Sequence, residues 1–242
     1  MLDWLESHTV EEAIDVLVLQ ETKLTDDKFP AQAFIDKGYE VAYFGQKTYN
    51  GVAIISRHPM TGVQKNIPGF EDEMARVISA QVLGVQVIGA YFPNGQSPES
   101  DKFAYKMRWL EALTQWVKSL SEQPSPIALM GDYNITWDDL DVWDPVELAG
   151  TIHCTLEERA HFKNLIDLGL FDAFRQIHPE EKKFSWWDYR EAAFRRNKGL
   201  RIDHILLSDS LKNDVLGCEI DKEPRKKERP SDHAPVWVKI KR

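Results

Sequence analysis

Residues 127–134 of the 242-residue chain have the sequence Ile-Ala-Leu-Met-Gly-Asp-Tyr-Asn. The apolar run 127–130 predicts a strand buried on both faces, and it leads directly into Asp132 and Asn134. A charged residue at a single strand end is usually structural. Here four short apolar runs meet such residues, so we expect one convergent site. The other three segments are Leu19-Gln20-Glu21, Arg201-Ile202-Asp203-His204 and Ser231-Asp232-His233.

Hydrophobic periodicity predicts about nine strands and three or four helices. A hairpin is expected from Arg76–Val82 and Val85–Tyr91 across Leu83-Gly84, whereas helical spacing covers Pro98–Ser121. Thr155 and Glu158 form a capping box that opens a helix ending near Leu168. Helices are also expected at residues 2–5 and Phe29–Lys37, and strands at Asp15–Leu19, Tyr39–Phe44, Gly51–Ser56, Phe184–Trp187, Ile202–Leu207, Val215–Ile220 and Val236–Ile240.

Strand pairs therefore occur beside strand–helix–strand segments, which favours mixed sheets. No linker composition and no internal repeat interrupts the pattern. We expect one domain over residues 1–242 of the α/β (α+β) class. Its architecture would be a four-layer α-β-β-α sandwich, with two packed mixed sheets between outer helices.

The charge balance is acidic, because 30 Lys and Arg face 39 Asp and Glu and give a net charge of −9. This disfavours nucleic-acid binding through bulk charge but does not exclude a nuclease, because metal-site carboxylates raise the acidic count. Basic residues gather close in sequence to Asp203 and Asp232, which makes phosphate contacts plausible there. The two basic clusters are Arg195, Arg196, Lys198 and Arg201, and Arg225, Lys226, Lys227 and Arg229.

The cysteine content and the start of the chain bear on the kind of protein and on its cellular location. Cys154 and Cys218 have no metal-site spacing and form no disulfide framework. No apolar run is long enough for a membrane span, and the first residues lack the basic start of a signal peptide. We therefore expect a cytoplasmic location.

Carboxylate oxygens from the four strand ends are hard ligands that suit Mg²⁺ or Mn²⁺. Zinc is less favoured, because the clusters lack cysteine and paired histidines at ligand spacing. Carboxylates, an amide and a histidine are suited to phosphodiester hydrolysis: a carboxylate takes a proton from water, while the histidine and the amide stabilise phosphate oxygens.

Five segments in order resemble the motifs of the exonuclease III-type abasic endonucleases, which belong to the endonuclease/exonuclease/phosphatase superfamily. The similarity covers nearly the whole chain. Tyr-Phe-Pro-Asn-Gly and the segment Phe184–Tyr189 are the narrower motifs and point to the exonuclease III branch. The five segments are Gln20–Lys23, Tyr91–Gly95, Gly131–Ile135, Gly199–Asp203 and Ser231–Pro235.

This resemblance implies a role for each matched position. Asp132 would orient or deprotonate the attacking water, Asn134 would hold that water or a phosphate oxygen, and His233 would contact the phosphate. Asp203 would fix the ring of His233 by a hydrogen bond. His204 would point to the other side of its strand. The residues implied to hold or flank the metal are Glu21, Asp132, Asn134, Asp232 and His233.

The resemblance also implies substrate contacts. Tyr91 would reach the phosphate or leaving group through its hydroxyl, and Asn94 would contact the substrate phosphate. Trp186 and Leu200 would line a pocket for a flipped-out deoxyribose without its base. Arg76 would support the site by pairing with a carboxylate.

Two departures from the family pattern bear on activity. Residues 1–5 resemble the helix that follows the family's first strand, so that strand and its polar ligand are expected to be missing. We then expect weak metal binding, low activity and poor stability, because a central strand lost from a sheet exposes its neighbours' edges. Two alternatives are open for His153: it faces water as a loop residue, or it narrows the pocket and favours 3′-end trimming over cutting at abasic sites.

The leading hypothesis is a Mg²⁺-dependent DNA-repair phosphodiesterase resembling exodeoxyribonuclease III. It would act on double-stranded DNA with abasic sites or damaged 3′ ends as a 3′→5′ exonuclease, a 3′-end phosphatase and an abasic-site endonuclease. We expect a monomer with no obligate protein partner. One alternative is a phosphatase for lipid or inositol phosphates; another is a regulator of the same fold that binds nucleic acid with weak or no catalysis.

Overall fold

The computed structural model describes residues 2–7 and 13–241. These residues fall into two compact units. Unit 1 holds the described residues up to Tyr91 together with Ala128–Gly131, and unit 2 holds Phe92–Ile127 and the described residues from Asp132 onward. None of the helices in the described part is long and apolar enough to cross a membrane.

The first six strands of unit 1 pair antiparallel. One sheet has the order β1-β3-β2, and Ile54 of β3 faces Val18 and Ala42 on its two neighbours. In the second sheet, β5 lies between β4 and β6, and the central residues of β7 lie next to β6 on its other side. The bounds are β1 Val16–Leu19, β2 Glu40–Phe44, β3 Val52–Ser56, β4 Met60–Lys65, β5 Val77–Val82, β6 Val85–Tyr91 and β7 Ile127–Asp132.

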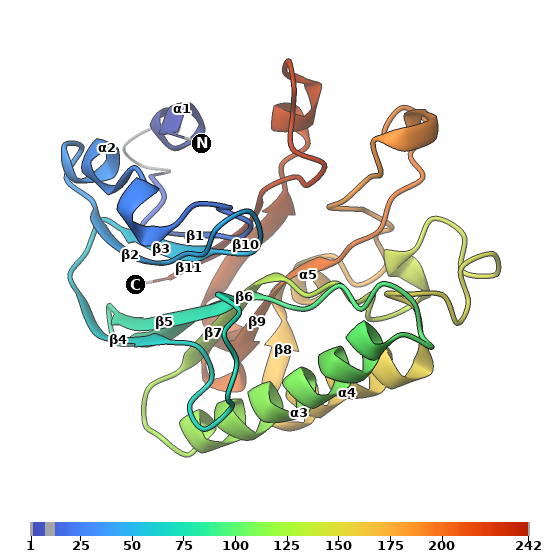
Figure 1. Ribbon diagram of the computed structural model, residues 1–242, viewed down its shortest axis with the longest axis horizontal. Helices are drawn as coiled ribbons and strands as arrows, with labels where there is room; N and C mark the ends of the chain where they lie inside the picture. Colours follow the sequence, from blue (N-terminus) through green and yellow to red (C-terminus); the bar gives the residue numbers. More distant parts are fainter. Residues whose placement is uncertain (1, 8–12, 242) are drawn as a thin grey trace. The chain divides into compact units, whose positions relative to one another are not determined.

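The core of unit 1 lies between these sheets, where Ile54 packs in one cluster with Ile78 and Val87. A second cluster covers the outer face of β3, where Trp4 and Phe34 pack on Ile55. Trp4 belongs to α1 (Leu2–Glu6) and Phe34 to α2 (Ala31–Ile35), and both helices lie on the outer side of this sheet in Figure 1. The short 3-10 helix η2 (Asp26–Lys28) precedes α2.

Unit 2 contains the long helices. Figure 1 shows α3 (Asp101–Ser121) and α4 (Leu156–Asp167) side by side. β8 (Leu170–Asp172) pairs antiparallel with β9 (Asp203–Ser208), and β10 (Val215–Ile220) with β11 (Val236–Ile240). The shorter helices are α5 (Ala173–Ile177), η3 (Asp139–Asp141), η4 (Arg190–Ala192), η5 (Asp209–Asp214) and η6 (Glu223–Lys226).

Local sequence signals account for many of these boundaries. Leu83 and Gly84, the predicted turn, both have positive φ (51° and 79°), as a two-residue hairpin loop requires. The predicted capping box is present at the start of α4, where the Thr155 side chain accepts from the Glu158 backbone and the Glu158 side chain accepts from the Thr155 backbone. Ser100 caps α3, so this helix begins a few residues after the predicted start.

The mixed α/β fold with several packed sheets confirms the predicted fold class. That residues 1–242 form a single domain stays a prediction. The predicted strand Phe184–Trp187 is wrong, because only Trp186 forms isolated bridges there, with Leu200 and His233. Ser185 and Trp187 send their backbone N–H groups to two different segments, at Leu200 and Asp232, so no continuous ladder forms. The strand β4 and the elements β8 and α5 were missed.

Candidate active site

The strand β7 delivers Asp132 through a close backbone contact. Gly131 has a φ of 146°, and a Cβ atom there would lie 2.0 Å from the Ala90 carbonyl oxygen. Only glycine fits this approach of β7 to β6 without a backbone shift. Asp132 follows, 5% exposed, and its Oδ1 accepts a hydrogen bond from the Asn134 backbone N–H at 2.9 Å. The turn is therefore held by the first carboxylate of the site.

Asn134 adopts a φ of 50° and uses its whole side chain within unit 2. Its amide group donates to Asp132 Oδ2 at 3.0 Å and to the Phe92 carbonyl at 3.1 Å, and its Oδ1 accepts from Asn94 Nδ2 at 3.1 Å. The rings of the neighbouring residues Phe92 and Tyr133 stack, with their centroids 4.1 Å apart. Asp132, Asn134 and Asn94 thus form one group connected by hydrogen bonds.

His153 joins this group from a turn before α4. Its Nδ1 lies 2.7 Å from the Asn134 carbonyl oxygen and its Nε2 lies 3.5 Å from Asn94 Nδ2. The ring must carry its proton on Nδ1 to make the first bond. Burial, together with the Lys106 ammonium, lowers the pKa of His153 to about 3, so the ring is neutral at pH 7. His153 is 8% exposed, and the alternative of a loop histidine that faces water is wrong.

His233 and Asp203 form the second group. His233 Nδ1 lies 2.9 Å from Asp203 Oδ2, which also accepts from the Ser185 hydroxyl at 2.6 Å. His233 Nε2 lies 3.9 Å from Asp132 Oδ2. Burial lowers the pKa of His233, but the carboxylate of Asp203, helped by Asp132 and Asp232, outweighs it and raises that pKa to about 10. His233 is therefore a cation at neutral pH, with Nε2 as its available donor.

Asp232 directly precedes His233, and its carboxylate contacts Trp186. Trp186 Nε1 donates to Asp232 Oδ2 at 3.0 Å, and Trp186 exchanges backbone hydrogen bonds with Leu200. Leu200 is 5% exposed and packs in a cluster with Val142 and Ile202. Trp187 is fully buried, which fits the expectation that one of the two tryptophans is core.

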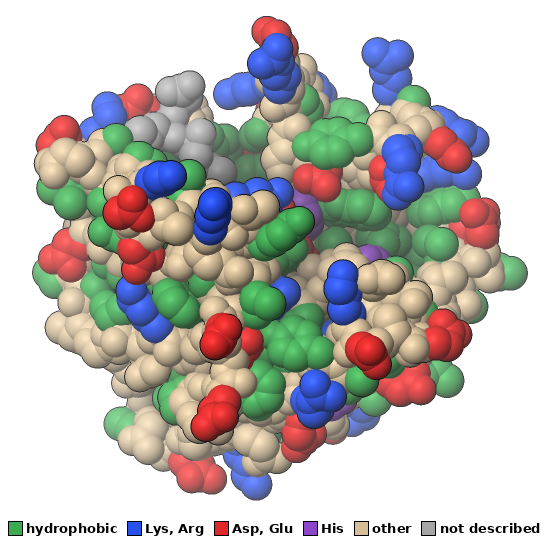
Figure 2. All heavy atoms as spheres, in the orientation of Figure 1, with side chains coloured by type: hydrophobic (Ala, Val, Ile, Leu, Met, Phe, Trp, Pro, Cys, Tyr) green, Lys and Arg blue, Asp and Glu red, His purple; other side chains and the backbone are tan. Residues whose placement is uncertain are grey.

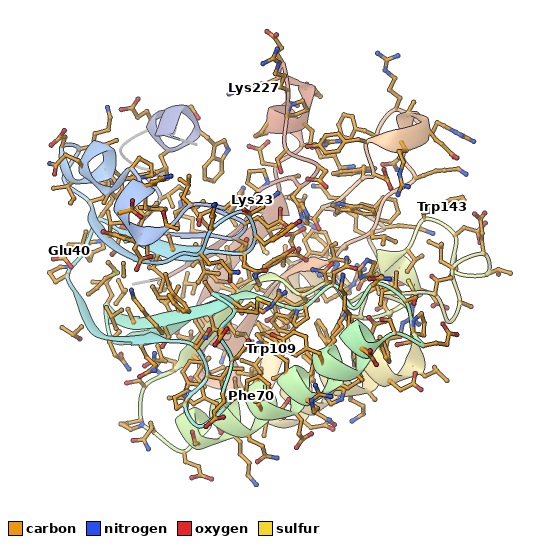
Figure 3. All side chains as sticks on the ribbon, viewed as in Figure 1. Lys23, Glu40, Phe70, Trp109, Trp143 and Lys227 are labelled. Atoms are coloured by element: carbon orange, nitrogen blue, oxygen red, sulfur yellow. The ribbon has the colours of Figure 1, made fainter. Side chains whose placement is uncertain are left out.

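Unit 1 holds the remaining predicted residues, Glu21, Tyr91 and Arg76. The Tyr91 hydroxyl donates to Glu21 Oε1, and Lys23, labelled in Figure 3, pairs with Glu21 Oε2 at 2.6 Å. Glu21 has a φ of 50°, and the loop is braced because Lys23 donates its backbone N–H to the Asn50 carbonyl at 2.9 Å. Arg76 donates to the Tyr91 carbonyl at 3.2 Å and lies over its ring; its pairing with a carboxylate stays a prediction.

The two basic clusters divide between surface and interior. Figure 2 shows Lys and Arg side chains gathered on the projecting loops around η4 and η6, and Lys227, labelled in Figure 3, lies on the second of these loops. Arg201 is fully buried, and Arg225 is 6% exposed, with its guanidinium near the rings of Trp187 and Phe194. The prediction of phosphate contacts is therefore wrong for these two arginines, which hold internal carboxylate or aromatic partners instead.

A divalent cation fits the donor set of unit 2. Asp132 and Asp203 each offer a carboxylate oxygen, and these two atoms lie within 4.8 Å of each other and of a ring nitrogen of His233. Carboxylate and amide oxygens match the hard-ligand preference of Mg²⁺ and Mn²⁺. Asp203 stands in this group although we expected it only as the partner of His233.

The sequence pattern did not predict the buried polar residues that support the site. The Ser185 hydroxyl accepts from the backbone N–H groups of Ile202 and Asp203 at 3.2 and 3.1 Å while it donates to the Asp203 carboxylate. Lys106 and Glu158 form a fully buried ion pair at 2.5 Å. One signal was available: Lys106 lies on the face of its helix that also carries Phe103 and Leu110.

A buried carboxylate–amide turn beside a His–Asp pair is the kind of site that suits the hydrolysis of phosphate esters. The chain belongs to the Endonuclease/Exonuclease/phosphatase family, whose model matches residues 1–233. It is 38% identical over 240 residues to exodeoxyribonuclease III of Haemophilus influenzae, covering 94% of this chain and 90% of that relative.

Solved structures agree with this assignment. A 3′ phosphatase from Neisseria, bound to a product DNA hairpin, superposes with a TM-score of 0.95 at 44% identity and covers 99% of this chain and 93% of that one. An AP endonuclease from Archaeoglobus fulgidus has a TM-score of 0.94 at 33% identity, with 99% and 92% covered. These matches confirm the predicted function class, an exodeoxyribonuclease III-like hydrolase of a metal-dependent family that acts on DNA.

Proposed function

We propose that this chain is a Mg²⁺-dependent phosphodiesterase that processes the 3′ ends of double-stranded DNA and incises DNA at abasic sites. The observation that carries the proposal is the His233–Asp203 pair, whose free Nε2 lies 3.9 Å from the Asp132 carboxylate. A cationic donor beside a buried carboxylate can serve a phosphate oxygen and the attacking water at the same time. The names of the relatives favour DNA as the substrate.

Each residue of this group has a distinct task in the proposal. Asp132 accepts the proton of the attacking water or orients it, and Asn134 fixes the Asp132 carboxylate by two hydrogen bonds at 2.9 and 3.0 Å. His233 donates from Nε2 to a phosphate oxygen, because Asp203 already holds Nδ1. The charge of the imidazolium offsets the negative charge that builds on the phosphate in the transition state.

Within unit 2 the cation would be held by the side-chain oxygens of Asp132, Asn134 and Asp232, because the protonated ring of His233 has no lone pair to give it. The predicted metal contact of Glu21 stays a prediction. When bound, Mg²⁺ neutralises charge on the phosphate and on the leaving oxygen. Asn94 contacts the substrate phosphate, whereas the expected reach of the Tyr91 hydroxyl to the phosphate or leaving group stays a prediction. Trp186 and Leu200 line the site of the deoxyribose, with Arg76 in support. The monomeric state, the cytoplasmic location and the effect of His153 on the balance of activities remain predictions.

The test is cleavage of two duplex substrates, one with a recessed 3′ end and one with a single abasic-site analogue, in Mg²⁺ and in chelator. We expect cleavage only with the metal. Asp203→Asn keeps the shape of the side chain but weakens the hold on His233, and kcat should fall by about 10²- to 10⁴-fold. Asp209→Asn, a change at an exposed carboxylate, is the matched control and should keep wild-type kcat.

Three outcomes would contradict the proposal. Cleavage that persists in chelator would remove the metal from the reaction. Tight binding of the abasic duplex without any cleavage would favour the regulator of the same fold. Equal kcat for Asp203→Asn and Asp209→Asn would show that the His233–Asp203 pair has no part in catalysis.

A further inference from the structure

Lys106 lies in α3 with a side chain that is fully buried, and its ammonium group meets three acceptors. Nζ donates to the Asn134 carbonyl at 2.7 Å, to the Asn94 carbonyl at 3.2 Å and to Glu158 Oε1 at 2.5 Å. An ammonium has three N–H donors, so every donor of Lys106 is used. Two of its three acceptors are the backbones of residues that we place at the phosphate.

Glu158 is equally saturated. Its Oε1 accepts from Lys106 and from the His153 backbone N–H at 3.1 Å, and its Oε2 accepts from the Thr155 backbone and hydroxyl at 3.0 and 2.9 Å. The carboxylate thus ties the start of α4 to the turn that carries His153. A buried carboxylate that accepts from four donors, one of them an ammonium, has no capacity left for water or substrate.

The ion pair closes a ring of contacts through His153. The His153 ring bonds the Asn134 carbonyl, the same oxygen that Lys106 bonds, and reaches the Asn94 side chain. Asn94 in turn donates to Asn134 Oδ1. Three chain segments, at residues 92–95, 134–136 and 153–158, are therefore fixed around one buried charge pair.

We infer that Lys106 and Glu158 are positioning residues, whose buried ion pair sets the side chains of Asn94 and Asn134 for the phosphate. Neither residue touches substrate in this arrangement. The inference rests on the proposed function for its consequence in catalysis, but the positioning itself does not. Small displacements of a group that binds a reacting phosphate cost rate more than binding.

The decisive variant removes both charges with near-isosteric side chains, Lys106→Met with Glu158→Gln. Each single change leaves one buried charge unpaired and is expected to destabilise the fold, whereas the double variant leaves none. The matched control is Lys118→Met with Glu157→Gln, which alters an exposed lysine of α3 and an exposed glutamate of α4. Thermal unfolding of both doubles shows whether each is folded at the assay temperature.

Two readouts are made on the folded proteins. In the first, kcat and KM are measured for the 3′-recessed duplex with Mg²⁺. We expect the double variant to lose about 10- to 100-fold in kcat with KM changed by less than about 3-fold. The control should keep both constants. Wild-type kcat in the folded double variant would overturn the inference.

The second readout does not depend on activity. The side-chain amide resonances of Asn94 and Asn134 are recorded by ¹⁵N–¹H NMR and assigned through Asn94→Asp and Asn134→Asp. We expect both resonances to shift or broaden in the double variant and to stay in place in the control. Unchanged resonances would overturn the positioning role. Shifted resonances in a chain whose wild type cleaves no DNA would support the positioning role and reject the proposed function.

Discussion

Unit 2 contains two buried charge networks that differ in what they hold. Lys106 and Glu158 bond mainly to the backbone of site segments, so their partners are carbonyl and N–H groups of the chain. Arg201 bonds to side chains. Its Nε lies 2.7 Å from Asp141 Oδ1, and its Nη2 lies 2.7 Å from Asp172 Oδ2.

The positions of the two networks explain the difference. Asp172 ends β8, Asp141 ends η3, and Arg201 lies two residues before β9, so the arginine joins three structural elements. Arg201 also donates its backbone N–H to the Asp141 carbonyl at 2.8 Å. We infer that the Arg201 network mainly stabilises the fold, whereas the Lys106 network mainly orients the site. Three variants, compared by their free energy of unfolding, can break or sharpen this comparison.

Arg201→Met should have the largest effect. The change leaves Asp141 and Asp172 buried with one guanidinium fewer, and Arg175 is the remaining cation at Asp141. Breaking a buried ion pair from one side costs about 3–5 kcal/mol of stability. Urea unfolding followed by circular dichroism measures this loss. Lys163→Met, which removes an exposed i,i+4 pair with Asp167, is the control and should leave the midpoint unchanged. A loss no larger than that of the control would refute a stabilising role for Arg201.

The strand-end pattern predicted much of the site because it depends on local order. Asp132, Asp203 and His233 follow or begin apolar segments, and a polar residue at that place is visible in the sequence alone. The grouping of Asp132 with Asn134 followed from adjacency. The expectation that Trp186 or Trp187 is core followed from alternation, and Trp187 is the buried one.

The supporting residues could not be predicted in the same way. Lys106, Ser185 and Arg225 are polar residues that usually face water, and their partners come from segments far away in the sequence. Glu158 was visible only as the second half of a capping box, and nothing local indicates that it also pairs with Lys106, 52 residues away. Burial of Arg201 was hidden for the same reason, because a run of basic residues is the pattern of a solvated loop.

The contributions of the two networks to stability should be lost in different pH ranges. A change at His153 tests the Lys106 network. The unfolded chain takes up a proton on His153 near pH 6.5, while in the folded chain its pKa is lowered to about 3. Stability is therefore lost as the pH falls below 6.5, by about 2 kcal/mol at pH 5, since each unit below 6.5 costs about 1.4 kcal/mol. His153→Gln should lose about that much less between pH 7.5 and pH 5.

The Arg201 network titrates lower. Burial raises the pKa of Asp141 and Asp172, but Arg201 outweighs it and holds both pKa values below the usual 3.8. The Arg201 network therefore contributes its full stability above about pH 3.8, and this contribution is lost as the pH falls below that value. Unfolding in urea at pH 7.5, 6 and 5 measures the difference, with the half-buried His58→Gln as control. Identical pH dependence of wild type and His153→Gln would mean that His153 is charged in the folded chain near pH 5.

Thr155→Ala should have the smallest effect on the free energy of unfolding. It tests whether the Thr155 hydroxyl only caps the helix or also supports the ion pair. The Thr155 hydroxyl accepts from the Glu158 backbone N–H at 3.1 Å and donates to Glu158 Oε2 at 2.9 Å. Loss of such an N-cap costs about 1 kcal/mol. In the Glu158→Gln background the cost should be smaller if the hydroxyl also orients the carboxylate, because residues of one network do not act additively.

The cycle is completed by measuring the free energy of unfolding for the two single variants and for the double variant. Thr151→Ala is the control: this exposed hydroxyl donates to the Leu148 carbonyl at 2.7 Å and has no bond to Glu158. Its cost should be the same in both backgrounds. If Thr155→Ala were equally additive, the hydroxyl would be a helix cap alone, and the Lys106–Glu158 pair would hold its geometry without it.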